Sequence, residues 1–349
     1  MSNYKVSIIV PCYNIDSIDF IDKNPFNKMI DSIVYQSFGI ENIEVLLVDD
    51  CSTDDTRNVL IKLSKEFTSI HPIFLEENSG RPSIPRNRGI DEATADYVMF
   101  LDQDDEMDLD CVKILYNEIV SKNTDFVKSN YSIKMGDNIL NYDTGNNKRL
   151  VIKPKSEEMV YLVSHFIWGS IYNKNFLNEY DIRFPDTQAE DNLFLSKCYN
   201  FTDKDIISIN DYHSIIYTAN NNNSLSHSFT LKQITDYVNI FEETMDSFIK
   251  YGQHQKFISL NIERYIIILI GSLLRSKEDF GTKKEMIRKI KGFLLKYKKK
   301  DIELAFMWKV FYILILHDKY HLVNLSSSLI NVVFENRIFA KLFRNKDYQ

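Results

Sequence analysis

The sequence lacks several patterns that define common protein classes. Its four cysteines, Cys12, Cys51, Cys111 and Cys198, are widely spaced and form no C-x-x-C pair. This spacing favours neither a zinc ribbon nor a disulfide framework, and it is typical of reduced thiols in a cytosolic protein. Basic residues are also outnumbered, because 42 Lys and Arg face 49 Asp and Glu and give a net charge of -7. We therefore expect no nucleic-acid partner, since a general nucleic-acid-binding protein needs a basic surface.

No apolar run approaches the ~20 residues that a membrane-spanning helix needs. The longest apolar runs are residues 265–274 and 305–316, and Lys309 interrupts the second run. The N-terminal residues also lack the apolar stretch of a signal peptide. We therefore expect a cytoplasmic protein that is soluble or, at most, peripheral to the inner face of the cell membrane.

A glycine-rich phosphate loop is absent as well. No G-x-G-x-x-G or Walker pattern follows the first apolar run, and the whole chain has 10 glycines. If the protein binds a nucleotide, we expect a metal ion and an arginine to neutralise its phosphates in place of a glycine-rich cradle.

Strand and helix signals alternate in the first ~130 residues, which is close to the usual size of one domain. Residues 6–10, 45–48 and 72–75 are apolar runs that predict buried strands, and apolar residues at helical spacing lie between them. Strands that alternate with helices form βαβ units and a mainly parallel sheet. We therefore predict an α/β fold in which residues 1–130 form a Rossmann-like nucleotide-binding half.

The sequence changes character toward its C-terminus. Residues 131–228 are mixed, all seven prolines lie at or before Pro185, and four asparagines occupy positions 220–223. Beyond them the apolar residues recur at helical spacing, and this spacing continues through residues 258–274 and 329–343. We predict two domains, residues 1–228 and a helical C-terminal domain at residues 229–349.

The most informative stretch is residues 97–105. An apolar run ends in three carboxylates within four positions, Asp102, Asp104 and Asp105. A buried strand that ends in acidic residues places them at the edge of the sheet where open α/β folds bind ligands. Carboxylates at i and i+2 can converge on Mg²⁺ or Mn²⁺, which would in turn hold a diphosphate. An ordinary acidic turn after a buried strand has the same composition and remains the alternative.

Polar residues follow the other predicted strands. Pro11 and Tyr13 follow the first strand, where a nucleotide base could stack on the tyrosine, although packing explains such a tyrosine equally well. Asp50 could accept the N3–H of uracil or the ribose hydroxyls, or it could cap a helix. Asn78 and Arg86 lie in the polar loop before the acidic stretch. The guanidinium of Arg86 matches a phosphate in geometry, and a solvated loop arginine is the alternative.

Further candidates lie in the mixed region. Asp191 follows Glu190 and could act as a general base, although acidic residues also favour a first helical turn. His227, in a polar loop, could contact a metal ion or diphosphate. Trp168 could stack on a sugar ring or pack in the core.

Taken together and in order, these motifs resemble the family-two inverting glycosyltransferases of the GT-A fold. They read P-C-Y-N, D-D-C-S-T-D, N-S-G-R-P-S-I-P-R-N-R-G-I, F-L-D-Q-D-D and A-E-D-N-L-F, and they extend over about residues 4–230. The loop before the acidic stretch is most similar to that of the wall teichoic acid glycosyltransferases, which act on poly(ribitol phosphate). Two positions depart from the usual motifs of the family. Pro85 replaces an alanine, and Gln103 replaces a serine. Gln103 is the middle residue between Asp102 and Asp104, so its replacement should not alter metal binding.

The resemblance implies a metal-dependent, inverting transfer of a sugar from a UDP-sugar to a bacterial teichoic acid or other surface polysaccharide. It implies that Asp50 contacts the base and that Arg86 lies beside the nucleotide sugar. It also implies that Asp102 and Asp104 engage ribose, diphosphate and Mn²⁺ or Mg²⁺, and that Asp191 is the catalytic base. Residues 131–228 would then form the acceptor half of the catalytic domain, and the C-terminal helices would mediate a homo-oligomer.

Two alternative functions, and the role of one basic segment, are undecided at this point. A sugar-nucleotidyltransferase also uses acidic metal ligands on a nucleotide-binding fold, and a non-catalytic scaffold could retain the fold alone. Nine basic residues crowd segment 283–300. This segment could bind a phosphate-rich polymer or the anionic inner leaflet, or it could be a solvated helix face.

Overall fold

The computed structural model describes most of the chain, namely residues 4–15, 25–135, 138–141, 148–162, 166–218, 229–298, 303–304 and 306–323. It divides into two compact units. The first unit comprises residues 1–154, 164–186 and 197–221, and the second comprises residues 155–163, 187–196 and 222–349. The domain boundary predicted at residues 228 and 229 stays a prediction, because residues 219–228 lie outside the described part of the chain.

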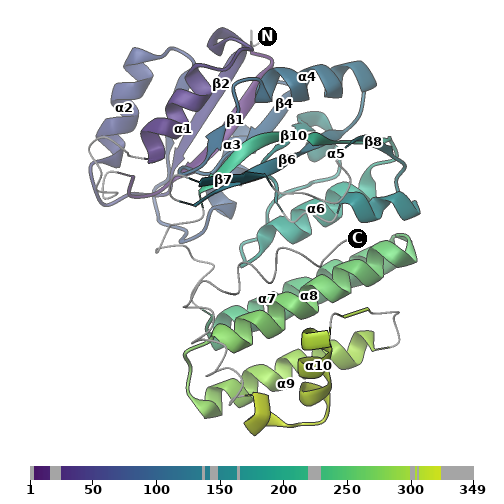
Figure 1. Ribbon diagram of the computed structural model, residues 1–349. Helices are drawn as coiled ribbons and strands as arrows, with labels where there is room; N and C mark the ends of the chain where they lie inside the picture. Colours follow the sequence, from purple (N-terminus) through teal and green to yellow (C-terminus); the bar gives the residue numbers. More distant parts are fainter. Residues whose placement is uncertain are drawn as a thin grey trace. The chain divides into compact units, whose positions relative to one another are not determined.

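The strands described in the first unit form one ten-stranded sheet (Figure 1). Its order is β3-β2-β1-β4-β9-β6-β10-β5, with β7 added beside β6 and β8 beside β10. The strands are β1 Val6–Cys12, β2 Ile43–Asp49, β3 Ile70–Phe74, β4 Tyr97–Phe100, β5 Glu106–Met107, β6 Phe126–Met135, β7 Asn138–Asn141, β8 Arg149–Ile152, β9 Ser170–Asn173 and β10 Ile206–Thr218.

The first half of this sheet is parallel. Strand β1 pairs with β2 and β4, and β2 pairs with β3, all in parallel register. All seven residues of β2 are buried, because helices cover both faces of a parallel sheet and leave no strand position in water. The helices of this unit are α1 Pro25–Val34, the 3₁₀ turn η1 Ile40–Asn42, α2 Thr56–Glu66, α3 Ser83–Glu92, α4 Cys111–Lys122 and α5 Lys174–Glu179. The predicted α/β architecture is confirmed.

The second half of the sheet is mixed and positions the acidic stretch. Strand β9 is antiparallel to β4 and β6, whereas β6 and β10 are parallel. The two residues of β5, directly after the acidic stretch, pair with Ile215 and Ile216 of β10. The end of β10 is therefore fixed beside residues 102–107, a contact between segments that lie over a hundred residues apart in sequence.

The second unit is helical, as predicted for the C-terminal region. Its elements are the 3₁₀ turn η2 Glu157–Leu162, the start of α6 Glu190–Phe201, and helices α7 Leu231–Lys250, α8 Gln255–Arg275, α9 Phe280–Tyr297 and α10 Phe306–Leu316. Side chains cap three of these helices: Thr230, His254 and Asp279 accept hydrogen bonds from the first-turn amides of α7, α8 and α9. The helical spacing at residues 329–343 lies outside the described residues.

One described helix, α8, is long and apolar enough to cross a membrane. Its most apolar window has a mean hydropathy of 1.7, and 72% of that window is buried inside the structure. The buried core helix of a helical unit has the same length and composition, so α8 is weak evidence for a membrane span.

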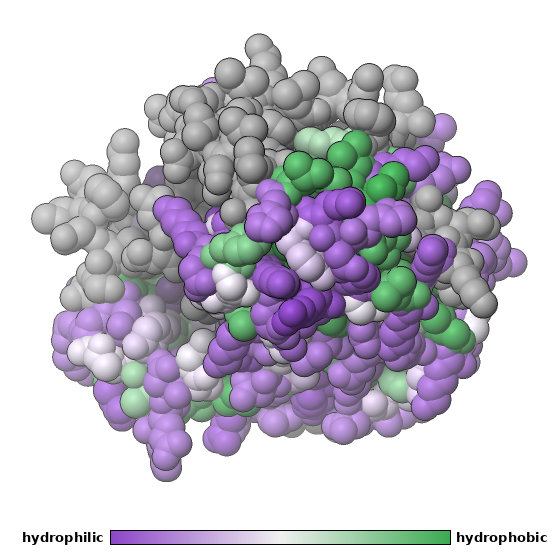
Figure 2. Space-filling view, turned by 90° about the horizontal axis from the view of Figure 1, so that it is seen from below, coloured by the Kyte–Doolittle hydropathy of each residue, from purple (hydrophilic) through white to green (hydrophobic). Residues whose placement is uncertain are grey.

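Acidic residues neutralise part of the basic segment, most of which lies on α9. Lys296 forms ion pairs with Glu242 and Asp246 of α7 at 2.9 and 2.8 Å, and Lys291 pairs with Asp318 at 2.6 Å. The coloured part of the face in Figure 2 is mainly hydrophilic, with groups of hydrophobic residues among the hydrophilic ones. The binding of a polymer or a membrane by residues 283–300 stays a prediction.

The contact between α3 and β1 depends on Gly89. A Cβ added there would lie 2.3 Å from Cγ2 of Ile9, which is far inside van der Waals contact. We expect Gly89→Ala to lower the free energy of unfolding by about 1–3 kcal/mol, measured by urea denaturation. The control is Gly292→Ala in α9, where an added Cβ meets nothing within 4 Å. It should be neutral or stabilise by up to about 1 kcal/mol. Equal stability of Gly89→Ala and wild type would contradict the close packing.

Candidate active site

Most of the predicted site residues lie at one edge of the first unit's sheet. Pro11 is the second-to-last residue of β1, Asp50 directly follows β2, and Asp102 and Asp104 follow β4. Because β2, β1 and β4 are neighbouring parallel strands, their carboxyl ends meet at the same edge. The structure therefore brings together residues that are up to 93 positions apart in sequence, as the topology of the sheet predicts.

Asp50 organises the loop that follows β3. Its carboxylate accepts hydrogen bonds from the backbone N–H of Ser79 at 3.0 Å and of Gly80 at 3.2 Å. The side chain of Asn78 donates to the backbone carbonyl of Asp50 at 2.8 Å. The helix-cap alternative for Asp50 is wrong, since α2 begins after Asp55. Asp50 and Asn78 thus fix the backbone of this loop, and the predicted contact of Asp50 with a base stays a prediction.

Gln103 joins the acidic stretch to the turn after β1. Its side-chain oxygen accepts from the N–H of Tyr13 at 2.8 Å, and its amide nitrogen donates to the carbonyl of Tyr13 at 3.2 Å. The ring of Tyr13 is 42% exposed, as stacking on a base would require. The sequence analysis treated Gln103 as a neutral replacement and missed this role, because its partner Tyr13 lies 90 residues away in sequence.

Arg86 is buried in α3 and points at the acidic stretch. Its Nη2 lies 2.7 Å from Oδ1 of Asp102, and the two side chains are 4% and 33% exposed. The guanidinium also lies over the ring of Phe184, 5.4 Å from its centroid. The alternative of a solvated loop arginine is therefore wrong. Because Asp102 is the more exposed partner, the ion pair presents a carboxylate to solvent and keeps the cation behind it.

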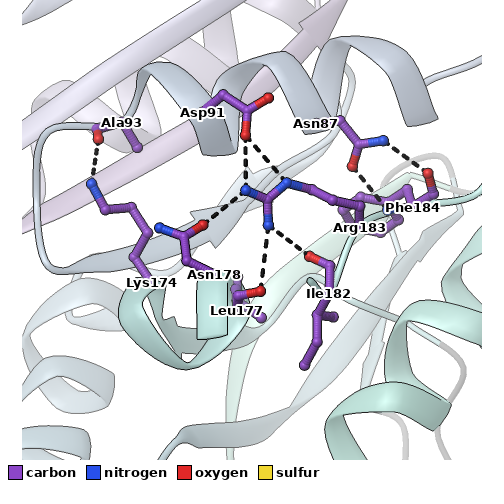
Figure 3. A network of polar contacts seen from close by, with 9 residues as sticks. All are labelled: Asn87, Asp91, Ala93, Lys174, Leu177, Asn178, Ile182, Arg183 and Phe184. Atoms are coloured by element: carbon purple, nitrogen blue, oxygen red, sulfur yellow. Dashed lines mark hydrogen bonds and ion pairs between the residues drawn. The ribbon is translucent and has the colours of Figure 1, made fainter. Parts of the chain in front are cut away.

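A polar network holds Phe184, the residue whose ring contacts Arg86, in place (Figure 3). Asn87 donates to the carbonyl of Phe184 and accepts from its N–H, both at 2.8 Å. Arg183 bonds Asp91 and Asn178, each at 2.8 Å. Segment 183–184 is thereby fixed against α3, so the ring beneath Arg86 cannot move away easily. The sequence motif contained Asn87, but nothing in it indicated a partner 97 residues away.

Asp105 gives the acidic stretch its unusual electrostatics. Burial raises the pKa of Asp105 well above the usual range of a carboxyl, and Asp102 and Asp104 raise it further. Its Oδ1 accepts from the N–H of Thr218 at 3.0 Å, while its Oδ2 has no hydrogen-bond partner among the described residues. Asp102 is paired with Arg86, but Asp105 has both neighbouring carboxylates beside it, so a cation bound here would relieve their repulsion.

These residues fit a divalent cation that is shared with a ligand. The described residues contain no group of three or more His, Cys, Asp or Glu side chains arranged to hold a metal on their own. Mg²⁺ usually binds one or two protein carboxylates and takes its other ligands from phosphates and water. Asp102 and Asp104 supply the hard oxygen donors that such a shared site needs.

Two predicted residues remain, Asp191 and His227. Asp191 is in the first turn of α6, within the second unit. The next residue, Asn192, fixes this turn: its amide donates to the carbonyl of Ala189 at 3.1 Å and its oxygen accepts from Tyr265 of α8 at 3.1 Å. His227 lies outside the described residues. The roles predicted for Asp191 and His227 stay predictions.

Comparisons with known proteins agree with this geometry. Residues 7–174 match the family model described as Glycosyl transferase family 2. The chain is 32% identical over 205 residues to the poly(ribitol-phosphate) beta-N-acetylglucosaminyltransferase TarS of Staphylococcus aureus, which covers 56% of this chain and 32% of TarS. It is 30% identical over 223 residues to the poly(ribitol-phosphate) beta-glucosyltransferase of Bacillus spizizenii, which covers 61% of this chain and 32% of that protein. The chain thus spans about a third of the length of these curated relatives.

A solved structure shows the same fold. The crystal structure of S. aureus TarS in complex with UDP-GlcNAc matches with a TM-score of 0.70 at 19% sequence identity, covering 95% of this chain and 92% of that chain. The predicted fold, a GT-A domain followed by a helical C-terminal region, is confirmed.

The raised pKa of Asp105 predicts a pH-dependent stability. The folded state disfavours the ionised carboxylate, so the stability that Asp105 contributes is complete below its unfolded pKa of about 3.9 and is lost as the pH rises. Asp105→Asn stays neutral at every pH. We therefore expect this variant to melt at a higher temperature than wild type at pH 7 in EDTA, and the gain to shrink as the pH falls toward about 4. Differential scanning calorimetry across this range measures it, and a gain that grows at low pH would refute the assignment.

Proposed function

We propose that this chain transfers a sugar from a UDP-sugar to a teichoic acid polymer, because residues 7–174 match the family model of glycosyl transferase family 2. The observation that carries the proposal is the convergence of Asp102, Asp104 and the buried Arg86 at the sheet edge, next to the loop that Asp50 orders. Two relatives are named for transfer to poly(ribitol-phosphate), and the matched TarS structure contains UDP-GlcNAc. Since those relatives are named for different sugars, the acceptor is the better supported part of the substrate assignment.

The proposed reaction is a single displacement. The acceptor hydroxyl attacks the anomeric carbon, a new C–O bond forms opposite the leaving group, and the bond to the UDP oxygen breaks with its electron pair leaving on UDP. Asp102 and Asp104 would hold Mn²⁺ or Mg²⁺, and the ion would offset the negative charge that develops on the diphosphate. Arg86 adds a fixed positive charge at the same place, held by Asp102 and Phe184.

The proton of the acceptor hydroxyl needs a base on the side opposite UDP. We assign this role to Asp191, because a displacement with inversion requires one base and this carboxylate lies in the A-E-D-N-L-F motif. The Asn192 side chain fixes the turn that carries Asp191, so the base has a defined backbone position.

The other functions have less support. A sugar-nucleotidyltransferase would release pyrophosphate, and nothing in the family match or the site favours that reaction over sugar transfer. A scaffold would have no need for three mutually repelling carboxylates beside a buried arginine. A cytoplasmic location, contact with the inner membrane surface and a homo-oligomer formed through the C-terminal helices remain proposals.

The proposal predicts metal-dependent release of UDP. With UDP-GlcNAc or UDP-glucose and poly(ribitol phosphate), we expect turnover in Mn²⁺ or Mg²⁺ and its loss in EDTA. Asp104→Asn should lower kcat/KM by about 100-fold or more, because it removes a carboxylate that would hold the metal ion, and the ion would offset the charge on the diphosphate. The matched control is Asp211→Asn, which alters an exposed carboxylate of β10 and should retain wild-type activity. Full activity of Asp104→Asn in EDTA would exclude the metal.

The general base is tested separately. Asp191→Asn should lower kcat by about 10²–10⁴-fold, since the amide cannot accept the acceptor proton. Its affinity for the UDP-sugar, measured by calorimetry, should stay close to that of wild type. A variant with unchanged turnover would show that another group, or water, takes the proton.

A further inference from the structure

An aromatic cluster of the first unit ends beside the acidic stretch. Trp168 is buried at its centre, with Phe166 stacked on it at a centroid distance of 4.3 Å and an interplanar angle of 17°. Tyr131 meets Trp168 edge-on at 4.8 Å. Tyr217 of β10 stacks nearly parallel to Trp168, at 5.9 Å and 12°. Trp168 is therefore a core residue, and the ring it supports nearest to the site is that of Tyr217.

Backbone contacts on both sides of Tyr217 place it at the acidic stretch. The preceding residue, Ile216, pairs with Glu106 of β5. The N–H of the following residue, Thr218, donates to Oδ1 of Asp105 at 3.0 Å. Burial, and then the charges of Asp105, Asp104 and Asp102, raise the pKa of Tyr217. The phenol therefore stays protonated in neutral solution and keeps its hydrogen-bond donor next to these carboxylates.

Two other tyrosines of the unit use their hydroxyls inside the protein. Tyr172 donates to the carbonyl of Ile167 at 3.1 Å, and Tyr212 donates to Asp108 at 2.5 Å. The half-buried Tyr217 makes no hydrogen bond through its hydroxyl within the described residues. No described residue uses the donor and the acceptor of this hydroxyl, so both are available to a ligand that binds at the acidic stretch.

We propose that Tyr217 is a sugar-binding residue of this site, whose hydroxyl bonds a hydroxyl group of the donor sugar or of the polyol acceptor. The proposal rests on the proposed function, because it takes Asp102 and Asp104 as the diphosphate end of the site. Trp168 holds the ring in one orientation, so little side-chain freedom is lost on binding. Both sources share the same chemistry, an alcohol that donates and accepts, and the experiment separates them.

The test uses Tyr217→Phe, which removes the hydroxyl and keeps the stack on Trp168. We expect kcat/KM for sugar transfer to fall by about 3- to 10-fold, the effect of one neutral hydrogen bond, while the affinity for UDP stays unchanged. A partner on the donor sugar would also weaken UDP-sugar binding and slow UDP-sugar hydrolysis without acceptor. A partner on the acceptor would raise only the KM for poly(ribitol phosphate). Tyr35→Phe is the control, because it removes the hydroxyl of a residue that is 70% exposed.

The outcomes separate the two proposals. If wild type transfers sugar and Tyr217→Phe does so with the same kinetic constants for both substrates, the role of Tyr217 is overturned and the proposed function stands. If wild type neither binds nor turns over any UDP-sugar, the proposed function fails and the assignment of Tyr217 fails with it. Equal melting temperatures of Tyr217→Phe and wild type would show that a kinetic loss comes from substrate contact and not from unfolding.

Discussion

The ion pair between Arg86 and Asp102 is the contact on which the proposed site depends. It joins α3 to the end of β4, and its cation is almost fully buried while its anion faces solvent. A buried guanidinium is costly unless it is paired, so Asp102 and the Phe184 ring together keep Arg86 in the folded interior. The result is a positive charge that cannot swing away, beside carboxylates that are suited to a divalent ion.

The loops around this ion pair are held by a few side chains that bond backbone groups. Asp50 bonds the amides of residues 79 and 80, Gln103 bonds both backbone groups of Tyr13, and Asn87 bonds both backbone groups of Phe184. The backbone N–H and C=O groups of a loop have no neighbouring strand to pair with. Hydrogen bonds from side chains such as these take the place of that pairing. Binding sites need such preorganisation, because a mobile loop must be ordered at the expense of affinity. Several polar residues of the motifs therefore fix the shape of the loops around the proposed site.

Much of the first unit could be predicted from the sequence because its signals are local. The apolar runs at residues 6–10 and 45–48 fall inside β1 and β2, and parallel pairing alone brings Asp50 and Asp102 to one edge. The mixed half was not predicted in detail. The pairing of β5 with β10 joins residues over a hundred positions apart, and the two register shifts in β10 have no local signature. For the same reason the contacts of Asn87, Gln103 and Tyr217 could not be predicted: their partners are set by the fold and not by neighbours in sequence.

Asp105 shows why electrostatics favours a cation-binding role over a purely structural one. A carboxylate that is buried, repelled by Asp102 and Asp104, and bonded by the N–H of Thr218 alone among the described residues lowers the stability of the ion-free fold at neutral pH. An asparagine or serine at this position would fill a similar space without that penalty. A bound divalent ion would reverse the balance. The three carboxylates that repel one another would each be attracted to the cation, and binding would then stabilise the folded state. Under the proposed function, the acidic stretch would form one half of a charge-balanced complex, and the metal ion and the nucleotide would form the other half.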